Sequence, residues 1–240
     1  MTSEKKKVAE IINSAKEKGR FELLEQESKH LLAAWGVPVN RTELAKDRSE
    51  AIRIARDVHY PLVIKIASPD IPRKSAVNCV KVGIGSEIEL RQAFDEIIRN
   101  ALSYKPNAEI IGVTVQEYLP PAREVIIGAQ QDPSFGATVR FSLAKLWDDV
   151  LRDFSIRLAP LSQEDAREMI QEVRGYPVLE GIRGELPADV DALVGMLQKV
   201  GQLVHEFPEI VGLRTNPVFV FDAGKGAVVA DARIVIRRGK

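Results

Sequence analysis

Apolar residues recur every three to four positions along several stretches of the chain, which is the spacing of one face of a helix. This pattern predicts helices over residues 4–18, 22–35, 47–58, 87–100, 162–173 and 189–206. Short apolar or alternating runs between turn residues predict strands over 62–67, 80–84, 110–118, 124–130, 138–143, 218–221 and 227–231. Helices and strands alternate in the first half and strands meander in the second, so we expect an α+β fold of two lobes.

The composition is that of a folded protein, because 45% of the 240 residues are hydrophobic and 34 basic side chains balance 34 acidic ones. A single cysteine, Cys79, excludes an intrachain disulfide framework and any multi-cysteine metal site. No apolar run approaches the roughly 20 residues that span a membrane, and no apolar segment of a signal peptide follows the first charged residues. We therefore expect a soluble, cytoplasmic protein whose partners include neither a membrane nor a nucleic acid.

Two charged residues lie in predicted strands. Lys65 interrupts the apolar run 62–67, where a lysine either reaches water at a strand edge or meets an anion in a cleft. Glu124 begins the strand 124–130, and alternation places it on the same face as Ile126. A surface carboxylate at a strand start is the ordinary explanation for such a glutamate. The residues alone leave both alternatives open.

Asn216 and Asp231 fall on adjacent strands of the last predicted hairpin. Magnesium in nucleotide sites takes one or two protein oxygens together with phosphates and waters, so this pair is chemically adequate as a ligand set. Asn216-Pro217 is also an ordinary turn dipeptide, and the pair alone is a weak indication of a metal site.

The order of these features resembles that of ATP-grasp domains, and more closely the β subunit or domain of ADP-forming acetyl-CoA (acyl-CoA) synthetases. The similarity extends from about residue 23 to residue 236. The matching segments are 25–32, 36–39, 60–71, 123–128, 132–136, 154–161, 181–189, 216–220 and 229–233. The resemblance implies an ATP-grasp fold of two lobes with a nucleotide cleft between them. We divide the chain into an N-terminal helix (1–20), a small lobe (21–116) and a large lobe (117–240).

The resemblance also implies ligands and residue roles. The ligands would be ATP or ADP with Mg²⁺, and a separate CoA-binding α subunit would be the partner. Lys65 resembles the lysine that contacts nucleotide phosphates, and Glu124 the carboxylate near the ribose. The remaining residues resemble the hinge whose backbone binds adenine, which is Gln116, Glu117, Tyr118 and Leu119, and the Mg²⁺ ligands, which are Asn216 and Asp231.

The chain departs from the family where the family does its chemistry. Arg73 stands where the family has the histidine that carries a phosphoryl group between two active sites, and a guanidinium has no nucleophilic lone pair. Asn78 and Cys79 replace paired glycines in the same loop. We therefore assign no catalytic residue in this chain.

Two further departures concern phosphate and metal. Residues 142–145 replace a Gly-Leu-Gly-Gly segment, and Asp149 follows where a glutamate is usual. Arg214 places a positive charge where an acid normally helps hold the metal.

Three functions stay open at this point. The family indicates the nucleotide-binding β subunit of an ADP-forming acyl-CoA synthetase, which reversibly converts acyl-CoA, ADP and phosphate to acid, ATP and CoA. Arg73 favours instead a degenerate subunit with a structural or regulatory role, or an ATP-grasp ligase that needs no histidine carrier. The acyl substrate is not encoded in any motif that we find.

Overall fold

The computed structural model describes residues 2–144 and 150–238, and most of its long helices begin at a side chain that caps them. Thr2, Asp47 and Ser86 each accept a hydrogen bond from a backbone amide in the first turn. The helices that follow are α1 (Ser3–Glu17), α3 (Arg48–Val58) and α4 (Glu87–Tyr104). Ser162 and Asp189 cap α6 (Gln163–Glu172) and α8 (Val190–Glu206) in the same way. These five helices confirm the periodicity in the sequence.

The chain divides into two compact units, one of residues Asn40–Pro120 and one of Met1–Val39 together with Pro121–Lys240. This division differs from the predicted lobes, since residues 21–39 belong to the larger unit. Backbone hydrogen bonds hold them there: the Leu23 amide donates to the Ile234 carbonyl and the Val229 amide to the Pro38 carbonyl, both at 2.9 Å. The helix α2 (Glu25–Ala34) begins three residues later than the predicted residue 22, because the backbone of Leu23 pairs with Ile234.

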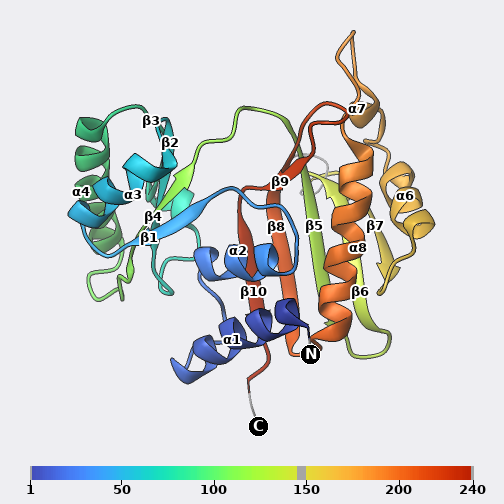
Figure 1. Ribbon diagram of the computed structural model, residues 1–240, viewed down its shortest axis with the longest axis horizontal. Coiled ribbons are helices and arrows are strands. Elements are labelled where there is room, and N and C mark those ends of the chain that lie inside the picture. Colours follow the sequence, from blue (N-terminus) through green and yellow to red (C-terminus); the bar gives the residue numbers. More distant parts are fainter. Residues whose placement is uncertain (1, 145–149, 239–240) are drawn as a thin grey trace. The chain divides into compact units, whose positions relative to one another are not determined.

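The unit Asn40–Pro120 is built on an antiparallel four-stranded sheet of order β1-β4-β2-β3 (Figure 1). The strands are β1 (Thr42–Ala45), β2 (Leu62–Ala67), β3 (Val80–Ile84) and β4 (Gly112–Glu117). Leu62, Ile64 and Ile66 of β2 share one buried core with the apolar stripes of α3 and α4. Those helices therefore cover one face of the sheet. The strand β1 was not predicted, because its four residues include two polar side chains and are too few to show an alternation of apolar and polar positions.

The larger unit contains a six-stranded antiparallel sheet of order β10-β8-β5-β6-β7, with β9 paired to β8. The strands are β5 (Arg123–Asp132), β6 (Gly136–Leu143), β7 (Phe154–Leu158), β8 (Ile210–Val220), β9 (Ala227–Val229) and β10 (Ala232–Ile236). α8 lies along β5 and β6 in Figure 1, and α6 packs beside it. α1, α2 and the short α7 (Pro177–Glu180) complete the unit.

Alternation along these strands sorts the side chains into two faces. Val125, Ile127 and Ala129 of β5 belong to the core beneath α8, whereas Ile126 does not. The predicted alternation of Glu124 and Ile126 against Val125 and Ile127 therefore agrees with the packing. β7 and β10 were not predicted, and β8 begins eight residues earlier than predicted because Gly212 and Asn216-Pro217 interrupt its pattern.

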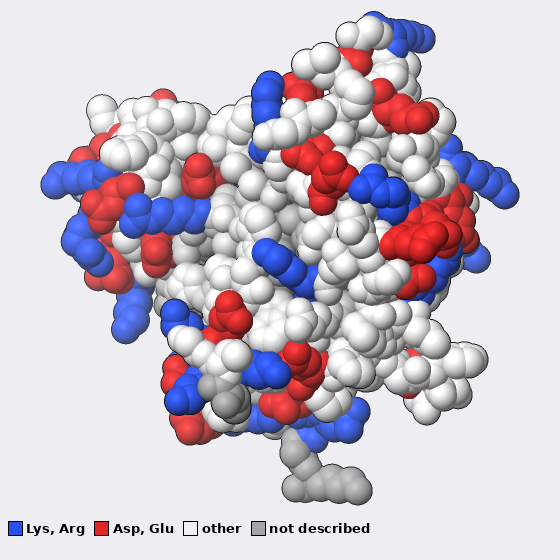
Figure 2. Space-filling view, turned by 45° about the vertical axis from the view of Figure 1, so that its right-hand side comes forward, with Lys and Arg blue, Asp and Glu red and all other residues white. Residues whose placement is uncertain are grey.

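The helices of the described residues and the charges on the surface agree with the composition of the chain. None of their helices is long and apolar enough to cross a membrane. In the view of Figure 2, basic and acidic side chains are interspersed over the surface, as the balanced composition leads one to expect.

Candidate functional site

Lys65 lies on a central strand of the four-stranded sheet, with β4 on one side and β3 on the other. Its side chain is on the face opposite to the α3 and α4 core, and the residue is only 8% exposed. An explanation by a strand edge, where the ammonium would reach water, therefore does not apply. A buried lysine needs compensation by polar or anionic groups.

Polar side chains line the same face beside Lys65. Thr114 is in register with it across β2 and β4, and the Thr114 hydroxyl donates to the Lys65 carbonyl at 3.3 Å. The Gln116 amide donates to the Thr114 hydroxyl at 2.9 Å. All three side chains are buried, so this face of the sheet is polar where the other face is apolar.

The predicted hinge, residues 116–119, begins in the last two residues of β4 and continues into the loop that follows. Gln116 and Glu117 are still in the strand, and Tyr118 and Leu119 follow it as half-buried loop residues. The Glu117 amide hydrogen is already donated to the Arg41 carbonyl at 3.0 Å, and its carbonyl accepts from the Asn40 side chain at 2.8 Å. The backbone N–H and carbonyl of Glu117 are therefore already paired within this unit.

In the larger unit the structure brings Asn216 and Asp231 together. The Asn216 amide hydrogen is donated to the Asp231 carbonyl at 3.0 Å, and the Ala230 amide donates to the Pro217 carbonyl at 3.0 Å. Asn216 is exposed and Asp231 is half-buried. An amide oxygen and a carboxylate are hard oxygen donors, so the pair fits Mg²⁺ by ligand chemistry. Among the described residues no group of three or more His, Cys, Asp and Glu side chains could hold a metal by itself.

Glu124 lies on the first part of β5, opposite Phe219 of β8. The preceding residue, Arg123, was not singled out from the sequence and makes several contacts. Its guanidinium donates to the Val178 carbonyl at 3.1 Å and to the Leu186 carbonyl, and it pairs with Glu185 and Asp222. Arg123 thereby ties α7 and the segment after it to the start of β5, which fixes the strand position from which Glu124 projects.

The loop that carries Arg73 is anchored near its start. Asp70 accepts from the Lys105 ammonium and from the Glu109 amide, and the Lys105 hydrogen bond holds the pKa of the Asp70 carboxyl below its usual range. Arg73 itself is exposed and precedes the 3-10 turn Lys74–Val77. Asn78 occupies the left-handed region at φ 53°, which asparagine tolerates better than most residues.

Cys79 is fully buried in the core shared with α4, and burial raises the pKa of its thiol. It is therefore a packed side chain and offers no accessible nucleophile.

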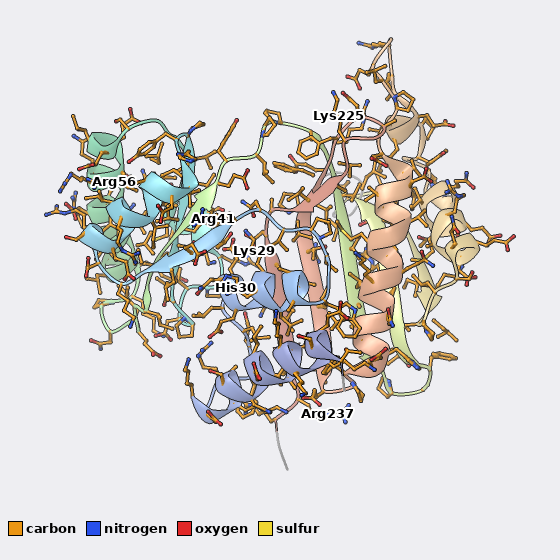
Figure 3. The ribbon with its side chains drawn as sticks, in the orientation of Figure 1. Lys29, His30, Arg41, Arg56, Lys225 and Arg237 are labelled. Carbon is orange, nitrogen blue, oxygen red and sulfur yellow. The ribbon has the colours of Figure 1, made fainter. Side chains whose placement is uncertain are left out.

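A second buried lysine, Lys29 on α2, was not singled out from the sequence (Figure 3). It is 3.3 Å from the Glu25 carboxylate, one helical turn earlier. The spacing Glu-x-x-x-Lys was the signal that could have found it. Lys145, Trp147, Asp148 and Asp149 lie outside the described residues.

A family model for the ATP-grasp domain matches residues 14–236. The β subunit of ADP-forming acetate–CoA ligase II from Pyrococcus furiosus is 43% identical over 228 residues, which are 95% of this chain and 97% of that subunit. A structure of acetyl-coenzyme A synthetase 1 from Ca. Korarchaeum cryptofilum with coenzyme A and Ca-AMPCP has a TM-score of 0.92 at 44% identity, covering 95% of this chain and 99% of that chain.

A second structure of the Korarchaeum synthetase holds coenzyme A and Mg-AMPPCP, with a phosphohistidine segment pointing towards the nucleotide binding site. It has a TM-score of 0.85 at 40% identity and covers 96% of this chain and all of that one. The chain belongs to the ATP-grasp family, whose fold its two sheets display. Within that family it is a member of the β subunits of ADP-forming acyl-CoA synthetases, as the sequence predicted.

Proposed function

We propose that this chain binds ADP and ATP as the nucleotide-binding β subunit of an ADP-forming acyl-CoA synthetase. Lys65 would contact the phosphates, Tyr118 and Leu119 would present backbone groups to adenine, and Glu124 would accept from the ribose. The observation that carries this proposal is the burial of Lys65 on a central strand among Thr114 and Gln116. From this polar face of the sheet an ammonium group can meet the negative charge of nucleotide phosphates.

Asn216 and Asp231 are the residues that would hold Mg²⁺. When bound, the ion would neutralise charge on the phosphate oxygens. The chain's own contribution is to position the phosphates and to meet their negative charge with the Lys65 ammonium. Related structures support this assignment, since the Korarchaeum synthetase was solved with Mg-AMPPCP.

A CoA-binding α subunit is the partner that we propose. The chain spans nearly the full length of a relative that is named a β subunit, and the Korarchaeum synthetase binds coenzyme A. The resemblance assigns CoA binding to the other subunit.

Arg73 favours a second candidate function, in which the chain binds nucleotide and supports its partner without carrying a phosphoryl group itself. The side chain is exposed on the loop at the position of the family's carrier histidine. A protonated guanidinium offers only N–H donors and cannot form a phosphoramidate by attack on phosphorus.

Nucleotide binding is tested by the melting temperature of the chain with Mg-ADP. At a ligand concentration about 100 times Kd we expect a rise of roughly 5 °C or more. Lys65→Ala should abolish this rise. Lys81→Ala is the matched control, because Lys81 is on the neighbouring strand but faces the helices and pairs with Glu96. No rise for the unmodified chain at millimolar Mg-ADP, or an equal loss in both variants, would refute the proposal.

A further inference from the structure

The two edges of the six-stranded sheet differ in what lies beside them. At the β10 edge, the Leu23 amide donates to the Ile234 carbonyl at 2.9 Å. The Ile236 amide donates to the Phe21 carbonyl at 2.8 Å, so the chain before α2 closes this edge. The other edge is β7, which among the described residues pairs with β6 alone (Figure 1). An edge strand without a second neighbour leaves backbone hydrogen-bonding groups open to another chain.

The pairing with β6 shows which backbone groups of β7 point outward. Directly after the strand, the Ala159 amide donates to a β6 carbonyl at 2.8 Å. Every second residue of an antiparallel strand faces the same neighbour, so the backbone groups of Phe154, Ile156 and Leu158 face away from β6. In agreement with this direction, the Ile156 carbonyl accepts a hydrogen bond from the Arg157 guanidinium at 3.0 Å.

The same three residues carry exposed apolar side chains. Phe154 is 41% exposed, Ile156 47% and Leu158 57%. Side chains of the residues between them point to the opposite face, where the Ser155 hydroxyl donates to the Met169 carbonyl of α6 at 2.8 Å. The three apolar side chains therefore lie on the face of the sheet away from α6, directly at the open edge.

The α6 side of this edge is acidic. Glu164, Glu168 and Glu172 follow one another at intervals of four residues on α6, and all three are exposed. The Arg157 guanidinium of β7 is 2.7 Å from the Glu172 carboxylate and 3.9 Å from the Glu168 carboxylate. These two carboxylates therefore project towards the strand, and a single guanidinium cannot balance the charge of both. The edge keeps a surplus of negative charge on its α6 side.

The charge on α6 decides which kind of strand fits beside β7. Two copies of this chain joined through antiparallel β7 strands would place both α6 helices on the same face of the joined sheet. The glutamates of one α6 would then face those of the other, and like charges repel. A strand with lysine or arginine on the α6 side and apolar side chains on the other side matches both faces of the edge.

We propose that the β7 edge binds an extended segment of a partner protein in which apolar side chains alternate with lysine or arginine. The segment adds a strand to the sheet, and its backbone pairs with the outward groups of β7. Its apolar side chains cover Phe154, Ile156 and Leu158. Its basic side chains meet the Glu168 and Glu172 carboxylates. This surface is separate from the residues proposed to bind nucleotide, so its occupation does not depend on Mg-ADP.

The probe is a dye-labelled peptide of about ten residues that alternates valine and lysine and has blocked ends. Its Kd for the full chain is measured by fluorescence anisotropy at constant ionic strength, and we expect saturable binding of one peptide per chain. A peptide with glutamate in place of lysine should bind about tenfold more weakly or worse, because its charge opposes that of α6. A peptide of the same composition in scrambled order should also bind about tenfold more weakly, because its apolar side chains no longer share one face.

Three changes at the edge separate the contributions. Ile156→Pro removes an outward N–H and leaves the pairing with β6 intact, so it should weaken binding of the lysine peptide about fivefold or more. The double change Glu168→Lys and Glu172→Lys should weaken the lysine peptide by a similar factor and allow the glutamate peptide to bind. Arg157→Gln should tighten binding of the lysine peptide, because it frees the Ile156 carbonyl and both glutamates.

Glu10→Lys is the matched control for charge, because Glu10 is exposed on α1. Phe135→Lys is the control for an exposed apolar side chain elsewhere, since Phe135 lies in the turn between β5 and β6. Each should change Kd less than twofold, and circular dichroism would show that every variant keeps its fold. Absence of binding of the lysine peptide, equal affinity for the scrambled peptide, or equal weakening by Glu10→Lys would overturn the proposal. A dimer in sedimentation equilibrium that Ile156→Pro dissociates would also overturn it, because the occupant would then be a second copy.

Discussion

The amide hydrogen of Asn216 is donated to the backbone carbonyl of Asp231 at 3.0 Å, across the point where β8 leaves the β9 pairing and meets β10. Two residues 15 positions apart in the printed sequence are thus immediate neighbours. Their side chains supply an amide and a carboxylate from one short stretch of the sheet. That adjacency is what a shared metal ion requires.

Asp231→Asn should remove most of the difference between the ADP-induced rise in melting temperature with Mg²⁺ and the rise in EDTA, because a neutral amide binds Mg²⁺ more weakly than a carboxylate. Thermal denaturation in both buffers measures it. Asp191→Asn is the control, since Asp191 is exposed on α8 and pairs with Arg167. A Mg²⁺-dependent increment that survives in Asp231→Asn would contradict the assignment of the metal pair.

Position 73 should carry no phosphoryl group. We expect no acid-labile label on this chain after incubation with radiolabelled ATP, Mg²⁺ and its α partner, because Arg73 has no lone pair that can attack phosphorus. Autoradiography after acid and after neutral gel conditions distinguishes phosphohistidine from stable phosphoesters.

Arg73→His alone should restore little label, and adding Asn78→Gly is the better second step, because Asn78 already has a left-handed backbone that glycine adopts freely. Cys79→Gly would empty a buried core position, so we expect it to lower stability by about 1–3 kcal/mol. Label on His30, His59 or His205 of the unmodified chain would show that transfer follows another route.

The ion pair between Arg20 and Glu27 should make stability depend on pH. Burial alone would raise the pKa of Glu27, but the hydrogen bonds from Arg20, at 2.6 and 2.5 Å, and from the Leu24 amide hold that pKa below its ordinary value. A carboxyl whose folded pKa is lowered stabilises the fold above its unfolded pKa and loses that contribution as pH falls through the folded pKa.

Urea unfolding between pH 7 and pH 3 measures this dependence. Glu27→Gln should lower the free energy of unfolding at pH 7 by about 1 kcal/mol and should make the acid side of the profile flatter. An acid profile as steep as that of the unmodified chain would show that other carboxyls account for the loss.

Asp153 should stabilise the fold and should take no part in nucleotide or metal binding. Its carboxylate accepts from the amides of Arg174 and Gly175 at 2.9 and 2.8 Å and is largely buried. Asp153→Ala leaves two backbone donors unpaired, so we expect a loss of about 1–3 kcal/mol in unfolding free energy with the nucleotide-induced rise unchanged. Loss of the rise at unchanged stability would contradict this role.

The sequence alone determined the long helices, most strands and the family. Lys65 illustrates why: a lysine among Leu62, Ile64 and Ile66 violates the apolar pattern, and such a violation is visible without a structure. Helical periodicity and helix capping depend on residues close together in the chain. The predicted ends of α1, α3, α4, α6 and α8 therefore lie within a few residues of the observed ends.

Only the tertiary structure decided which distant residues become neighbours. Residues 21–39 pack with the larger unit because their backbone groups pair with Val229 and Ile234, about 200 positions later. Arg214, Gly128 and Arg140 are neighbours on three adjacent strands only because of the register of those strands, and a shift by one residue would place each side chain on the opposite face. Register is set by the pairing of whole strands and by the core they share, which no local pattern encodes.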